Sequence, residues 1–169
     1  MRKALLFSVC VFVLTTAARA AVSGDYEYTD NGDTTCTITD YLGPGGDIII
    51  PDTLNDLTVT AIGDDTFYDC ANLTSVIIPD SVTIIETGAF SGCSSLTAIT
   101  VDSLNSAYSS IDGILFNKDQ TTLISCPGGK IGLYTIPESV ININSNAFSR
   151  CIGLISVTIP GNVTSIGNN

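Results

Sequence analysis

One pattern of apolar residues occurs three times in the chain and limits its fold more than any other feature. The first copy is TFYDCANLTSVIIP, residues 66–79, in which F-x-x-C-x-x-L-x-x-V-x-I closes on a proline. The register returns in AFSGCSSLTAITV and again in AFSRCIGLISVTIP, with Phe67, Phe90 and Phe148 at the same position. Such copies predict a repeat protein, because one unit of this length cannot enclose a core alone.

Each copy combines two spacings that predict a short strand preceded by a tight turn. The segment L-x-x-V-x-I ends in alternation, so Val76 and Ile78 should point inward and Ile77 outward. The segment F-x-x-C-x-x-L has a spacing of three, which suits a helical or 3₁₀ turn. Stacked copies place like residues on like residues. We therefore expect the three phenylalanines to form one interior column.

One repeat, between the second and third copies, is longer than the others. Its segment GILFNKDQTTLISC, residues 113–126, has two alternating runs around Asn117-Lys118-Asp119-Gln120, which predicts an inserted β-hairpin. The regular register then returns, with Ile131 standing where Leu154 stands one repeat later. Ile131 is therefore expected to point inward.

The first 20 residues have the features of a secretory signal peptide. Arg2 and Lys3 form a basic start, an apolar run follows, and Ala18-Arg19-Ala20 is a small-x-small cleavage site. The apolar run is shorter than the roughly 20 residues that a membrane-spanning helix needs. We expect a secreted or cell-surface protein that does not insert into the membrane.

Residues 21–169 are expected to form one solenoid. Its parts are the N-terminal strands with a first long repeat (34–78), a regular repeat (79–101), the lengthened repeat with its hairpin (102–136), a second regular repeat (137–160) and a truncated repeat (161–169). Because the sequence ends inside a repeat, we interpret it as a fragment of a longer array. Val163 and Ile166 should then lie at an uncovered edge.

Charge and composition argue against several function classes. Without the signal peptide, three cations stand against 17 acids, a formal charge of −14, so the basic footprint of a nucleic-acid partner is missing. There is no histidine, no phosphate-binding glycine loop and no C-x-x-C pair. The acid-rich segments 29–34 and 63–65 complete no calcium loop and are interpreted as solvated turns. We expect no enzyme activity, no cofactor and no metal site.

Five cysteines remain in the processed chain. Cys70, Cys93 and Cys151 occupy one repeat position, where a thiol acts as a small apolar side chain. We interpret them as reduced core residues, with Cys151 out of reach of Cys93. The sequence does not decide whether Cys36 pairs with Cys126.

The repeat is similar to a known family. The pattern L-x-x-V-x-I-P-x-S-V-x-x-I-x-x-x-A-F-x-x-C, present in residues 78–101 and 136–159, resembles the BspA-like class of leucine-rich repeats. The resemblance extends over about residues 34–169. It implies a strand-dominated α/β repeat fold, a right-handed solenoid with ~23-residue coils and one β-hairpin insertion. It also implies a protein that binds host proteins, extracellular-matrix proteins or another cell surface.

The outward positions of the repeated strands are the candidate binding face. We expect a flat, uncharged sheet face, although hydroxyl and β-branched side chains also suit any half-exposed strand. Its residues are Thr74, Ser75, Ile77, Thr97, Ala98, Thr100, Ile155, Ser156 and Thr158.

Two alternative functions remain open. A β-helix polysaccharide lyase has coils of similar length, but it would need acidic and basic side chains stacked on a strand face. An ice- or crystal-binding face is suggested by Thr97 and Thr100. It would need threonine in every coil, and Ala98, Ile155 and Ser156 interrupt that row.

Overall fold

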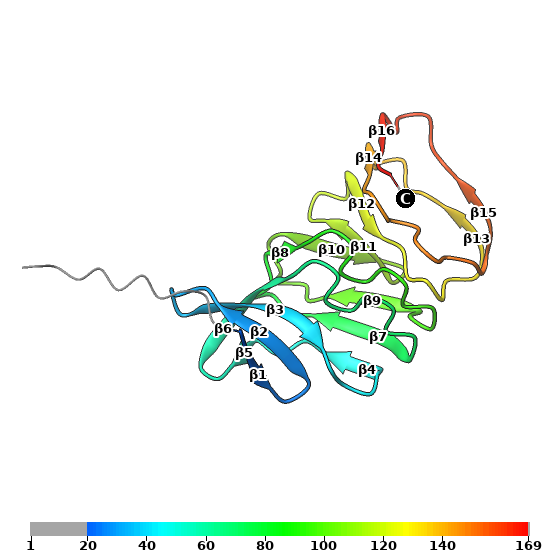
Figure 1. The fold of residues 1–169 in the computed structure, drawn as a ribbon. Helices are drawn as coiled ribbons and strands as arrows, with labels where there is room; N and C mark the ends of the chain where they lie inside the picture. Colours follow the sequence, from blue (N-terminus) through cyan, green and yellow to red (C-terminus); the bar gives the residue numbers. More distant parts are fainter. Residues whose placement is uncertain (1–19, 169) are drawn as a thin grey trace, which may run out of the picture.

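A computed structural model describes residues 20–168, which wind into a solenoid of short strands (Figure 1). The predicted signal peptide lies outside the described residues, apart from Ala20. No helix is found between residues 20 and 168. In chain order the strands are β1 (Ala20–Ser23), β2 (Tyr26–Asp30), β3 (Thr35–Tyr41), β4 (Gly46–Ile49), β5 (Thr53–Leu54), β6 (Leu57–Ile62), β7 (Leu73–Ile78), β8 (Ile84–Ile85), β9 (Ala98–Val101), β10 (Tyr108–Ile111), β11 (Ile114–Asn117), β12 (Thr122–Ser125), β13 (Gly132–Thr135), β14 (Asn142–Ile143), β15 (Leu154–Thr158) and β16 (Ser165–Ile166).

Antiparallel strands cover the N-terminal end of the solenoid. Strands β1, β2 and β3 pair in sequence, and β3 then pairs in parallel with β6 of the first coil. Tyr28, Cys36 and Ile38 from these strands are buried in the core. The repeat pattern does not predict β1 and β2. They close one end of a repeat stack, which needs a cover to keep its apolar edge from water.

The first coils pair strand on strand at the predicted spacing. Strands β4, β7 and β9 form a parallel sheet in which Val76 is opposite Ile99, a separation of 23 residues. Val76 and Ile78 are buried and Ile77 is exposed, as the alternation predicts. A second parallel pairing joins β6 to β8 on another side of the coil.

The F-x-x-C segments form isolated tight turns. The N–H of Tyr68 donates to the carbonyl of Asp65 at 2.8 Å, and the N–H of Ser91 donates to that of Gly88 at 2.7 Å. These are i to i+3 bonds of the predicted kind, but they do not extend into a helix. Adjacent turns are joined by the N–H of Phe67, which donates to the carbonyl of Ala89 at 2.8 Å.

The lengthened coil, residues 102–136, interrupts the parallel pairing. Its hairpin of β11 and β12 turns at residues 117–120 as predicted, and β10 adds a third, antiparallel strand. Strand β12 continues this sheet in parallel with β14 and β16, while β13 and β15 form a separate parallel sheet. Strands β9 and β13 belong to different sheets, as do β8 and β12. The solenoid is thus divided into two blocks.

The core is divided at the same coil. The Phe67 and Phe90 rings stack with centroids 5.2 Å apart and an angle of 11° between their planes. Phe148 packs in a second cluster, 6.5 Å from the Tyr134 ring. The expectation of a single phenylalanine column is therefore wrong. The intervening coil brings no phenylalanine to this position: Cys126 is there, and its N–H donates to the carbonyl of Ala147.

The C-terminal end of the described stack is less well covered than the N-terminal end. Ile166 is 61% exposed and Val163 is half-buried, as expected for an open edge. Ile166 borders a hollow of about 160 Å³ that is lined mainly by apolar side chains, among them Phe148 and Val157.

Candidate binding faces

The nine candidate residues lie on two sheets rather than one. Six belong to or directly precede β7 and β9, and the other three belong to β15. The turn between β10 and β11 lies against β9, because a Cβ added at Gly113 would lie 3.0 Å from the Cα of Ala98. The expected continuous face is therefore interrupted, since the inserted strands come between its two parts.

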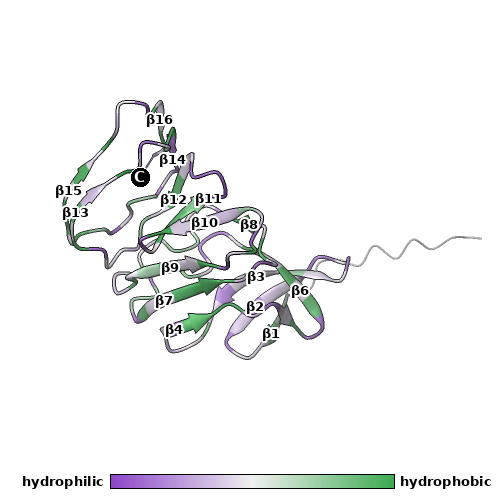
Figure 2. Cartoon of the chain, turned by 180° about the vertical axis from the view of Figure 1, so that it is seen from behind, coloured by the Kyte–Doolittle hydropathy of each residue, from purple (hydrophilic) through white to green (hydrophobic). Residues whose placement is uncertain are grey.

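The first face also extends onto β4, which the sequence analysis left out. Strand β4 is the free edge of this sheet, and Ile49 lies opposite Ile77. Figure 2 shows the apolar character of β4 and β7. Asp47, also on β4, is exposed. Alternation from the buried Ile50 could have indicated that both Asp47 and Ile49 point outward.

Asp47 corrects the expectation that this face is uncharged. Its Oδ1 atom accepts hydrogen bonds from the Thr74 hydroxyl at 2.6 Å and the Ser75 hydroxyl at 2.7 Å. These two bonds lower the pKa of the Asp47 carboxyl, so the group is a carboxylate at neutral pH. The hydroxyl of Thr97 donates to the carbonyl of Thr74 at 3.1 Å. Because the hydroxyls of Thr74 and Thr97 donate to acceptors within the protein, they do not favour an ice-binding array.

The second face, on β13 and β15, is strongly apolar. Leu133 and Ile155 are 77% and 81% exposed, and Ile131 is 78% exposed instead of pointing inward. The inward expectation for Ile131 is wrong because the register between β13 and β15 shifts at Gly132, which pairs with Leu154. Ile131 therefore precedes the first paired residue of β13 and its side chain is left in solvent.

The five cysteines are free thiols. Cys93 donates to the carbonyl of Phe67 at 3.0 Å, and burial raises its pKa to about 12. Cys36 is in the first core cluster and Cys126 in the second, so these two are not paired. Cys151 lies beside Cys126 and donates to its carbonyl at 3.5 Å. The contact with the Cys151 thiol, together with burial, raises the pKa of Cys126.

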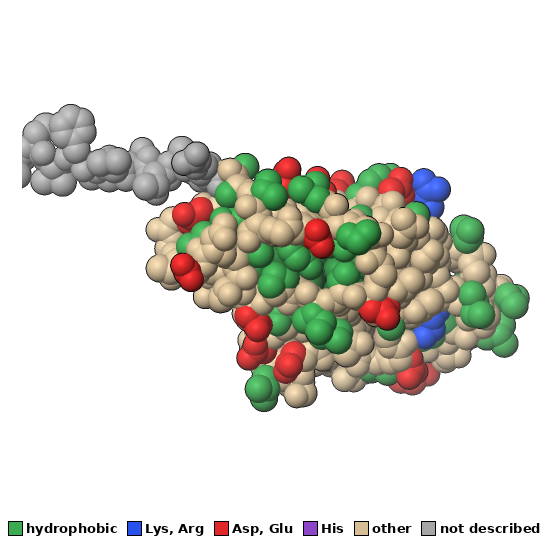
Figure 3. Space-filling view, turned by 90° about the horizontal axis from the view of Figure 1, so that it is seen from below, with side chains coloured by type: hydrophobic (Ala, Val, Ile, Leu, Met, Phe, Trp, Pro, Cys, Tyr) green, Lys and Arg blue, Asp and Glu red, His purple; other side chains and the backbone are tan. Residues whose placement is uncertain are grey.

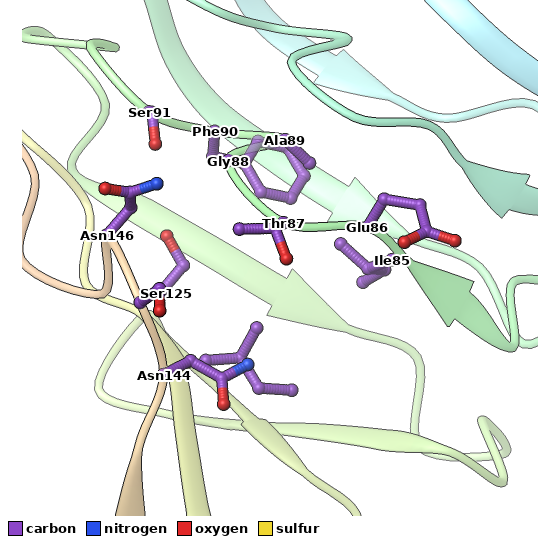
Figure 4. Close-up of a pocket in the computed structure, with 12 residues that line it drawn as sticks. Ile85, Glu86, Thr87, Gly88, Ala89, Phe90, Ser91, Ser125, Asn144 and Asn146 are labelled. Carbon is purple, nitrogen blue, oxygen red and sulfur yellow. The ribbon is translucent and has the colours of Figure 1, made fainter. Parts of the chain in front are cut away.

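A small polar crevice lies at the junction of the two blocks (Figure 4). It has a volume of about 40 Å³, roughly enough for three water molecules. Figure 4 shows Glu86 and Thr87 from the first block near Ser125, Asn144 and Asn146 from the second. One carboxylate among hydroxyl and amide groups can hydrogen-bond water, but the space is too small for an organic substrate.

Residues 20–168 offer neither a metal-ligand cluster nor a membrane-spanning helix. They contain no group of three or more His, Cys, Asp or Glu side chains that could hold a metal ion. None of their segments forms a helix long and apolar enough to cross a membrane.

Comparison with known proteins identifies the repeat. Residues 128–169 match the family described as "BspA type Leucine rich repeat region (6 copies)". No curated protein matches the chain. A leucine-rich repeat protein from Eubacterium ventriosum has 21% identity and a TM-score of 0.52, over 90% of this chain and 62% of its own.

Two further solved structures have similar identities. The leucine-rich repeat protein of T. pallidum has 23% identity and a TM-score of 0.48, over 88% of this chain and 54% of its own. One from Bacteroides capillosus has 24% identity and a TM-score of 0.49, over 84% and 99%. The chain therefore spans less than two thirds of the first two proteins. Residues 128–169 thus carry repeats similar to the BspA type, and the fold of the chain is that of a leucine-rich repeat solenoid.

Proposed function

We propose that the chain is an exported protein-binding module that uses the outward faces of its strands. The observation that carries this proposal is the pair of exposed faces, one on β4, β7 and β9 and one on β13 and β15. Repeat solenoids offer such extended surfaces, on which affinity comes from many contacts over several coils. The absence of histidine from the sequence further favours binding over acid–base catalysis.

The sequence supports export and limits the kind of partner. The basic start, apolar run and small-x-small site of residues 1–20 support secretion. The formal charge of −14 disfavours nucleic acids and anionic membrane surfaces as partners. The resemblance of residues 78–101 and 136–159 to BspA-like repeats implies that the partner is a protein of a host, of an extracellular matrix or of another cell surface.

Binding is tested with the processed chain, residues 21–169, immobilised for interferometry against a panel of purified extracellular-matrix glycoproteins. Thr100→Lys and Thr158→Lys each place a long cation on one face. The matched control is Ser165→Lys, an exposed serine on β16 of a different sheet. We expect a face variant to weaken binding by at least about tenfold, as for a central interface position, and the control to leave it unchanged.

Two results would contradict the proposal. One is the absence of binding to every protein of the panel and to intact cells. The other is binding that neither face variant reduces. Export is tested separately, by mass spectrometry of the chain released from cells that express residues 1–169; a first residue other than Ala21 contradicts the predicted cleavage.

A further inference from the structure

Four exposed aliphatic side chains gather around β13 and β15. Ile131, Leu133, Ile152 and Ile155 are between 77% and 88% exposed. Ile131 packs against Gly153, the residue that follows Ile152. A Cβ added at Gly153 would lie 2.8 Å from the Cγ2 atom of Ile131. Scattered exposed aliphatics are ordinary, but a contiguous group marks a surface that another molecule covers. We call these four residues the aliphatic patch.

Two of the three cations in residues 20–168 are close in sequence to this patch. Residues 20–101 contain 13 acids and no lysine or arginine, whereas residues 102–169 contain 4 acids and all three remaining cations. Lys130 directly precedes Ile131, and Arg150 is two residues before Ile152. In Figure 3 the blue side chains lie toward the right, whereas red ones are spread across the face. The aliphatic patch is therefore flanked by positive charge on an acidic protein.

The first block carries a surface of complementary chemistry. Ile49 is 68% exposed and Ile77 is 39% exposed, on adjacent strands. Asp47, on the same strand as Ile49, is held as a carboxylate by two hydroxyl donors. We call these three residues the acidic patch. It combines aliphatic side chains with negative charge, as the aliphatic patch combines them with positive charge.

We propose that the aliphatic patch of one molecule docks on the acidic patch of a second copy of this chain. Charge complementarity selects this pairing: contact between two aliphatic patches brings Arg150 of both copies together, and two acidic patches bring carboxylates together. Such a contact joins two different surfaces, so it can close into a ring or extend into a chain of copies. This self-association shares one premise with the proposed function, namely that the outward strand faces bind protein.

Self-association is measured by sedimentation velocity of the processed chain in buffer with about 150 mM NaCl, where only short-range charge pairs persist. One variant, Leu133→Ser with Ile155→Ser, removes the aliphatic patch. A second, Asp47→Asn with Ile49→Ser, removes the acidic patch. We expect each variant alone to associate at least about tenfold more weakly than the wild type, because apolar burial is lost.

A mixture of the two variants provides the decisive result. Each still has the patch that the other lacks, so an equimolar mixture should form one-to-one heterodimers and no larger species. Leu104→Ser is the matched control, since Leu104 is 77% exposed outside both patches. It should associate like the wild type. Arg150→Glu should weaken association, and Asp47→Asn alone should do so to a smaller extent.

Four results would overturn the proposal. These are a wild-type chain that stays monomeric at the highest concentration measured, a patch variant that associates like the wild type, a mixture without heterodimers, and a Leu104→Ser effect as large as that of the patch variants. Circular dichroism of each variant separates unfolding from loss of contact. Binding of foreign proteins is measured with the wild-type chain at concentrations where sedimentation shows it to be monomeric, so the two proposals fail independently.

Discussion

Residues 20–101 and residues 102–168 use the same repeat, but the first block is covered more completely. In the first block, antiparallel strands close one end, Phe67 stacks on Phe90, and the aromatic column continues to Tyr41 at 5.2 Å. In the second block Phe148 is only half-buried and Ile166 is largely exposed. The repeat thus specifies the shape of a coil, whereas the burial of each side chain depends on the coil above and below it.

Truncation of the repeated phenylalanine should show the largest difference between the blocks. Phe67 is fully buried, so Phe67→Ala should lower the free energy of unfolding by about 3–5 kcal/mol. Phe148→Ala should cost less, about 1–3 kcal/mol, because this ring is partly in water already. Urea unfolding followed by circular dichroism measures both. Equal losses would mean that the blocks are equally well packed.

Removal of a buried asparagine at the junction should have the next largest effect. The Asn105 side chain donates to the carbonyls of Pro79 and Val82 and accepts from the N–H groups of Ala107 and Tyr108. Asn105→Ala leaves these groups without partners and should cost about 2–4 kcal/mol.

The corresponding asparagine of the second block is a matched control. Asn162 donates to the Glu138 and Val140 carbonyls but is exposed, so Asn162→Ala should cost about 0.5–1 kcal/mol. Calorimetric melting of both variants gives the comparison, and hydrogen exchange at Ala107 and Tyr108 reports on the junction directly. Unchanged exchange in Asn105→Ala would contradict the role of this side chain.

A hydroxyl in the second block should destabilise the protein slightly. The Tyr134 hydroxyl is buried and has no hydrogen-bond partner among the described residues. Because a buried unpaired group loses its hydration without compensation, Tyr134→Phe should stabilise the protein by up to about 1 kcal/mol. Thermal unfolding at pH 7 tests this. A lower melting temperature would show that the hydroxyl has a partner in solution.

The smallest effect is expected at high pH, in the first block. Burial raises the pKa of Tyr26 to about 12, from 10. Between these values the unfolded chain has lost the tyrosine proton while the folded chain keeps it. The contribution of Tyr26 to stability is therefore fully present below pH 10 and is lost as the pH rises toward 12. Tyr26→Phe should flatten the fall in melting temperature over this range, and an identical pH profile would contradict the shift.

Much of the fold could be predicted from the sequence because its signals are local and repeated. The alternation at Val76 and Ile78, the turn at residues 117–120 and the 23-residue pairing of Val76 with Ile99 all agree with the structure. Strands β1 and β2 were missed, since residues 20–33 share no position with the repeat.

The candidate faces were only partly predictable. The outward positions of β7, β9 and β15 follow from alternation, but their division between two sheets does not. Asp47 and Ile49 join the first face because β4 pairs with β7, a contact between segments far apart in the sequence. Ile131 and Leu133 become exposed through a shift of register at Gly132. The pattern of residue types within one strand does not predict which strand it pairs with or in which register.

By itself, the sequence determined the coil: its length, its inward side chains, its tight turn and the position of the inserted hairpin, because each depends on spacing along the chain. Only the tertiary structure decided that this hairpin divides both the sheets and the core. The physical reason is that coil 102–136 has Cys126, rather than an aromatic ring, at the position between Phe90 and Phe148, so the aromatic column does not continue. Which neighbour fills that space depends on how the coils stack.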